Sequence, residues 1–117
     1  MRILVRGLLC MTLSMLAMPA HAHGPVLKCV LLDQQTVRCR GGYAEGDAAP
    51  GVGLEVIDHG GRTLLARKLD RDSLLTFPRP RGGYYVLLDV GPGEQAIVEH
   101  DEIGFPRTRD KARWVRR

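Results

Sequence analysis

Histidine side chains are the groups of this 117-residue chain best suited to chemistry. If the segment before His23 is removed, the free α-amine and the imidazole of His23 form a bidentate nitrogen chelate, a donor set that copper and nickel bind. Pro25 lacks the backbone amide that a square-planar amino-terminal site would need. His59, in a turn, and His100, beside two carboxylates, are the further candidate ligands. This pattern predicts a nickel, cobalt or copper ion at His23, His59 and His100; the alternative is that His23 is only the residue left by cleavage.

Catalytic side chains are sparse. His100–Glu102 groups a histidine with two acids, which suits acid–base chemistry. The chain after residue 22 contains a single serine, Ser73, and no recognisable nucleophile motif, so we predict that the protein is not an enzyme. Asp70 and Asp72 have a spacing that suits calcium in loops, and their alternative role is to fix a β-turn through bonds to backbone amides.

Residues 1–22 have the layout of a secretory signal peptide. Two arginines flank the start of an apolar run that ends at residue 16, and this run is shorter than the roughly 20 residues of a membrane-spanning helix. Ala20-His21-Ala22 is an A-x-A cleavage site, and Cys10 lies in the segment that would be removed. We predict a periplasmic or secreted chain that begins at His23 and has no transmembrane span; the alternative is an uncleaved amphipathic anchor.

Two cysteines, Cys29 and Cys39, follow the predicted cleavage site. An even pair in an oxidising compartment favours a disulfide, and the absence of a C-x-x-C motif argues against a thioredoxin-like function or a thiolate zinc site. Residues 26–32 and 36–43 alternate as two strands joined by a three-residue loop, and this register places Cys29 opposite Cys39. A cross-strand disulfide is therefore predicted, with two buried free thiols as the alternative.

Short strands separated by turns account for the rest of the chain. Fourteen Gly and seven Pro disfavour a helical bundle, and no long amphipathic helix is evident. The clearest alternation runs from Tyr84 to Val90 and ends at Gly91-Pro92-Gly93. The predicted fold is all-β, a small antiparallel two-sheet sandwich of the immunoglobulin-like or prealbumin-like type. Its seven expected strands are 26–32, 36–43, 52–58, 62–69, 74–77, 84–90 and 94–100.

Four stretches together carry a resemblance to a known family: Gly42–Gly46, Ala49–Val56, Leu69–Pro78 and Gly82–Gly91. They are similar to the polar strand end, the x-P-x-x-G-x-x-V motif, the D-x-D-G-x-F-x-F turn and the P-G-x-Y-x-V strand of the carboxypeptidase regulatory-like β-sandwich. Ser73 stands where that family usually has glycine. A secreted sandwich with a histidine at its predicted start also resembles periplasmic proteins associated with nickel and cobalt uptake, which implies a metal-related role.

The predicted mature chain consists of a β-sandwich domain at 23–103 and a basic tail at 104–117. Residues 23–106 carry nine basic and twelve acidic residues, a net charge of −3, whereas residues 107–117 carry six basic residues and one acid, a net charge of +5. The basic tail is predicted either to touch anionic lipid head groups or to be a solvated end, and nucleic acid is excluded as a partner. The residues expected to make the surface contact are Arg107, Arg109, Lys111, Arg113 and Trp114.

A complete sandwich pattern without a catalytic set predicts an exported, non-enzymatic binding module of the carboxypeptidase regulatory-like type. Its sheet and loop surfaces would bind a protein partner in the periplasm. The alternative function is a periplasmic nickel, cobalt or copper protein that uses His23.

Overall fold

The computed structural model describes residues 24–107 and 112–116. The predicted signal peptide, His23, Arg109 and Lys111 lie outside these residues. No helix in the described ranges is long and apolar enough to cross a membrane. The elements are β1 (Pro25–Asp33), β2 (Thr36–Tyr43), β3 (Gly53–Asp58), β4 (Thr63–Lys68), β5 (Leu74–Pro78), β6 (Tyr84–Gly91), β7 (Glu94–Glu99) and the short 3₁₀ turns η1 (His100–Glu102) and η2 (Arg113–Val115).

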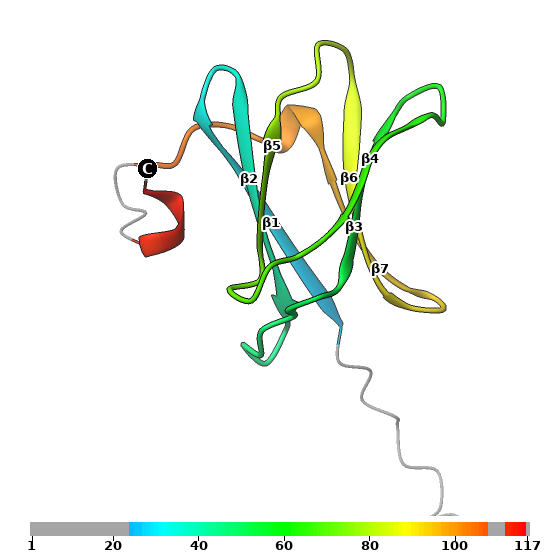
Figure 1. Ribbon diagram of the computed structural model, residues 1–117, viewed down its shortest axis with the longest axis vertical. Coiled ribbons are helices and arrows are strands. Elements are labelled where there is room, and N and C mark those ends of the chain that lie inside the picture. The colour runs from blue at the N-terminus through cyan, green and yellow to red at the C-terminus, as the bar shows by residue number, and fades with distance from the viewer. Residues whose placement is uncertain (1–23, 108–111, 117) are drawn as a thin grey trace, which may run out of the picture.

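The seven strands form two antiparallel sheets, which confirms the predicted two-sheet sandwich (Figure 1). The first sheet has the order β1-β2-β5 and the second has the order β4-β3-β6-β7. In an immunoglobulin constant domain the fourth strand pairs in the first sheet, whereas here β4 pairs with β3 in the second. Each observed strand begins and ends within a residue or so of its predicted bounds.

Alternate residues of both sheets build the core. Leu54, Val56, Val86 and Leu88 project from the second sheet and are fully buried, because β3 and β6 lie in register and present the same face. Val37 projects from the first sheet and is equally buried. The outward positions of these strands are mostly polar or partly exposed, as alternation predicts.

The disulfide predicted from the sequence is present. Cys29 and Cys39 are register partners on β1 and β2, and their sulfur atoms are bonded. The alternative of two free thiols is therefore wrong. The hairpin loop is shorter than predicted, because Asp33 pairs with Thr36 and accepts a hydrogen bond from Gln35 N at 2.8 Å.

The turn between β4 and β5 is fixed by side chains. Asp70 Oδ1 accepts hydrogen bonds from the backbone amides of Asp72 (2.8 Å) and Leu74 (3.0 Å), which is the turn role considered for this pair. Ser73 has a φ of 63°, a conformation that glycine adopts at no cost. Its buried hydroxyl accepts a bond of 2.8 Å from the backbone amide of Ala49, which explains how serine occupies this position.

Four connections lie at the same end of the sandwich. They are the β1–β2 turn, the β3–β4 turn, the β5–β6 loop and η1, which follows β7 (Figure 1). The bond from Leu31 N to Gly104 O, 2.9 Å, ties the end of β1 to the segment after η1. Gly24 and the start of β1 lie at the opposite end, because β1 runs along the full length of its sheet (Figure 1).

Tyr84 provides a test of core burial. Burial raises the pKa of its phenol above the ordinary value near 10, and the charge of Arg79 opposes this only in part. The neutral phenol is therefore the form that the fold favours, so its contribution to stability is present below about pH 10 and is lost as the pH rises through the raised pKa. We predict that Tyr84→Phe reduces the loss of unfolding free energy between about pH 9 and 11, measured by urea titration. Equal losses in both proteins would contradict this prediction.

Candidate metal centre

Three side chains converge at the loop end of the second sheet. His59 follows β3, Glu99 ends β7, and His100 begins η1. One ligand atom from each lies within 4.8 Å of the others. These three residues define the candidate centre.

His59 is positioned by a well-bonded turn. Asp58 Oδ1 accepts hydrogen bonds from the backbone amides of Gly60 and Arg62, both at 2.9 Å, and Asp58 N donates to Arg62 O. Gly61 has a φ of 85°, which lets the chain reverse within four residues. The turn therefore fixes the backbone of His59, whose imidazole then lies against Tyr85 with ring centroids 6.5 Å apart and nearly parallel planes.

His100 is held by the backbone of β6. Its Nδ1 lies 3.2 Å from Tyr84 O, and because a carbonyl oxygen only accepts, Nδ1 carries the hydrogen. This tautomer leaves a free lone pair on Nε2, the arrangement that metal-binding histidines usually show. The ring also packs edge-on against His59, with centroids 5.2 Å apart.

Glu99 completes the set. Its Oε2 lies 3.2 Å from His59 Nε2, and Glu102 Oε1 accepts a hydrogen bond from the Glu99 backbone amide at 3.3 Å. A tetrahedral ion with bonds of 2.0–2.1 Å places its ligand atoms about 3.3 Å apart, so the His59–Glu99 spacing already fits. The side chains of His59 and Glu99 are 53% and 44% exposed, so small rotations can close the remaining gap to His100.

The structure joins two of the three predicted metal ligands and adds one that the sequence did not indicate. His59 and His100 lie close together, but His23 lies outside the described residues, and Gly24, next to it in the chain, is at the other end of the sandwich (Figure 1). Glu99 was missed. Asp101 and Glu102, the carboxylates noted beside His100, are not members of the cluster, because η1 turns the chain after His100.

The tail residues predicted to contact a surface lie elsewhere. Arg113 and Trp114 form η2 beside the first sheet, where Arg38 Nη1 donates to Trp114 O at 3.1 Å and to Arg116 O at 3.0 Å. Arg107 is exposed. Residues 113–116 therefore lie against the first sheet, whereas Phe105 and Arg107 are exposed.

Gly83 touches the centre without being a ligand. A Cβ atom there would lie 2.7 Å from His59 Nδ1 and 2.9 Å from His59 Cε1, whereas one at Gly82 would meet nothing within 4 Å. We predict that Gly83→Ala displaces the imidazole and weakens zinc binding by about tenfold or more, as changes around a metal site commonly do. Gly82→Ala is the matched control and keeps the wild-type affinity. Calorimetric titration of both variants measures the difference, and equal affinities would show that His59 is not a ligand in this orientation.

No family model matches the chain, and no curated protein or solved structure matches it either. The resemblance to carboxypeptidase regulatory-like sandwiches stays a prediction. The convergence of His59, Glu99 and His100 is therefore the feature of the described chain that bears most directly on function.

Proposed function

We propose that this protein is a binding module for a divalent transition-metal ion held by His59, Glu99 and His100. The observation that carries the proposal is the convergence of two imidazoles and one carboxylate, with ligand atoms within 4.8 Å of one another, from three separate places in the chain.

The donor set favours a transition metal over calcium or magnesium. Imidazole nitrogen suits zinc, copper, nickel and cobalt, whereas calcium and magnesium prefer sites made of oxygen alone. His59 Nε2 and Glu99 Oε2 are joined by a hydrogen bond. Because a carboxylate only accepts, the imidazole nitrogen is the donor. A bound ion would take the place of the hydrogen between them, and the neutral imidazole of His59 would then carry its hydrogen on Nδ1.

The exposure of the centre favours reversible binding. Three protein ligands leave at least one coordination position for water or for an incoming group. Because His59 and Glu99 are about half exposed, an ion held there can be reached from solvent. This supports a role in holding and releasing an ion. Export and a protein partner, both predicted from the sequence, are compatible parts of this proposal.

Calorimetric titration with zinc, nickel, cobalt and copper(II) tests the proposal. We expect one ion per chain for at least one of these metals, and no saturable binding of calcium. Glu99→Gln should weaken binding by at least about tenfold, because an amide does not replace the charged ligand. Asp101→Asn, which alters the exposed neighbouring carboxylate, is the matched control and should bind as the wild type does. Absence of saturable binding, or equal losses in both variants, would overturn the proposal.

A further inference from the structure

The outer face of the first sheet carries two cations placed directly against each other. Lys28 on β1 and Arg40 on β2 are register partners, and both are exposed. Like charges at opposed positions of an antiparallel pair destabilise a sheet. Within residues 24–107 and 112–116, neither cation has an acidic partner within ion-pair distance. A repulsive pair without a counter-charge is a local cost that natural chains accept mainly at functional sites.

The 3₁₀ turn η2 packs on the first sheet beside Lys28 and Arg40. Arg38 holds η2 in place through the carbonyls of Trp114 and Arg116, and its Nε donates to Thr76 Oγ1 at 2.9 Å. Val30 and Val115 are only 5% and 8% exposed although neither belongs to the central core, so the turn covers apolar surface on the outer face. This packing fixes the position of Trp114.

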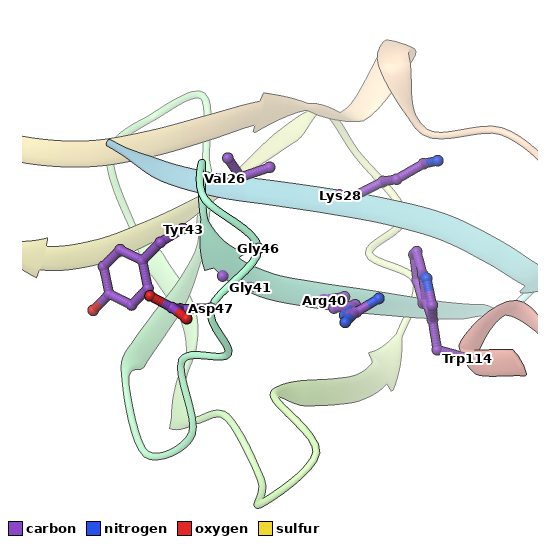
Figure 2. Close-up of a pocket in the computed structure, with 9 residues that line it drawn as sticks. Val26, Lys28, Arg40, Gly41, Tyr43, Gly46, Asp47 and Trp114 are labelled. Atoms are coloured by element: carbon purple, nitrogen blue, oxygen red, sulfur yellow. The ribbon is translucent and has the colours of Figure 1, made fainter. Parts of the chain in front are cut away.

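A pocket of about 300 Å³ lies between these parts. Figure 2 shows Lys28, Arg40 and Trp114 at one end of the pocket and Tyr43 and Asp47 at the other. Glycines line the space between the two ends, so the backbone is accessible there. The end near Trp114 thus combines two unpaired cations with a planar apolar side chain.

We propose that this pocket binds a phosphate-type oxyanion between Lys28 and Arg40, with Trp114 packing against the group that bears it. An arginine guanidinium matches two phosphate oxygens at once, and a lysine ammonium adds a point charge. Two opposed cations also favour a phosphate group, which carries one negative charge as a diester and up to two as a monoester near neutral pH. The phosphate group could belong to a soluble compound or to a phospholipid head group, since both present the same charged oxygens. The site lies on the outer face of the first sheet, whereas the metal centre lies at the loop end of the second sheet, so the two sites are separate and this one does not depend on the other.

The single tryptophan of the chain makes the test direct. Its fluorescence emission is recorded during titration with inorganic phosphate at constant ionic strength, and with vesicles of phosphatidylcholine alone or mixed with phosphatidylglycerol. We expect a saturable change with phosphate or with the phosphatidylglycerol vesicles. The first result identifies a soluble source and the second, obtained alone, identifies a lipid source.

Three variants distinguish binding in this pocket from nonspecific attraction of anions to a basic protein. Arg40→Gln and Lys28→Gln should each weaken the response by at least about tenfold, which is the usual effect of losing a charge-assisted hydrogen bond. Arg67→Gln, an exposed cation on the other sheet, is the matched control and should leave it unchanged. Zinc affinity should be unaltered in all three. No response to either titrant, or equal losses in all three variants, would overturn the inference without bearing on the metal centre.

Discussion

Replacing His100 by alanine is expected to weaken zinc binding by more than about 100-fold, since changes to groups that only support a ligand already cost 10–100-fold. His100 is the ligand whose tautomer is set by the backbone, through Nδ1 and Tyr84 O, so its Nε2 is available for a metal without rearrangement. His59→Ala should cause a loss of similar size. Calorimetric titration of the wild type and both variants measures these affinities.

Unfolding experiments supply the control for the histidine variants. His59 is exposed, so His59→Ala should lower stability by no more than about 0.5 kcal/mol without metal. His100→Ala removes the hydrogen bond to Tyr84 O and should cost about 0.5–1.5 kcal/mol. An ion present at about 100 times its dissociation constant should stabilise the wild type by about 2.7 kcal/mol and the variants by much less. The prediction would be contradicted if both histidine variants bound zinc as tightly as the wild type while His23→Ala lost zinc binding. That result would favour a site at His23.

Removing the disulfide has the second large expected effect. The bond joins residues ten apart in sequence, and the chain-entropy model gives a stabilisation of about 2.7 kcal/mol for a loop of this length. Cys39 is also fully buried in the core, so alanine there removes packing as well. We expect Cys29→Ala/Cys39→Ala to lower the unfolding free energy by about 3 kcal/mol in urea, a large part of the 5–15 kcal/mol typical of a small domain.

Reduction of the wild-type protein is the matched comparison for the cysteine variant. It breaks the bond and keeps both sulfur atoms, so it should cost slightly less than the double substitution. Zinc affinity should be unchanged in the double variant, because the disulfide lies in the first sheet and the metal centre lies at the end of the second. An unfolding free energy equal to that of the oxidised wild type would show that the bond does not restrain the unfolded chain.

The strands could be predicted because their signal is local. In Tyr84 to Val90 the buried residues alternate with partly exposed ones, and the glycines and prolines that follow end the strand where the structure ends it. The pairing of Cys29 with Cys39 was also predictable, since one short hairpin sets its register. The division of the strands between two sheets was left open, because similar turns serve both strand orders.

The candidate metal centre could be predicted only in part. His59 and His100 were identified by their residue type, but their approach depends on β3 pairing with β6 and β6 with β7. Glu99 was missed because it is a charged residue at a strand end, and only the register with Tyr85 brings it beside His59. The packing of Trp114 on the first sheet was missed for another reason: Arg38 binds backbone carbonyls, which every residue has.

Anomalous scattering from crystals of the zinc-loaded chain, collected at the zinc absorption edge, tests the proposed centre most directly. We predict one peak among His59, Glu99 and His100, at about 2.0–2.2 Å from one nitrogen of each imidazole and one carboxylate oxygen. A peak at His23 or only between neighbouring molecules, with none at His59, would contradict the proposal that these three residues form the metal centre.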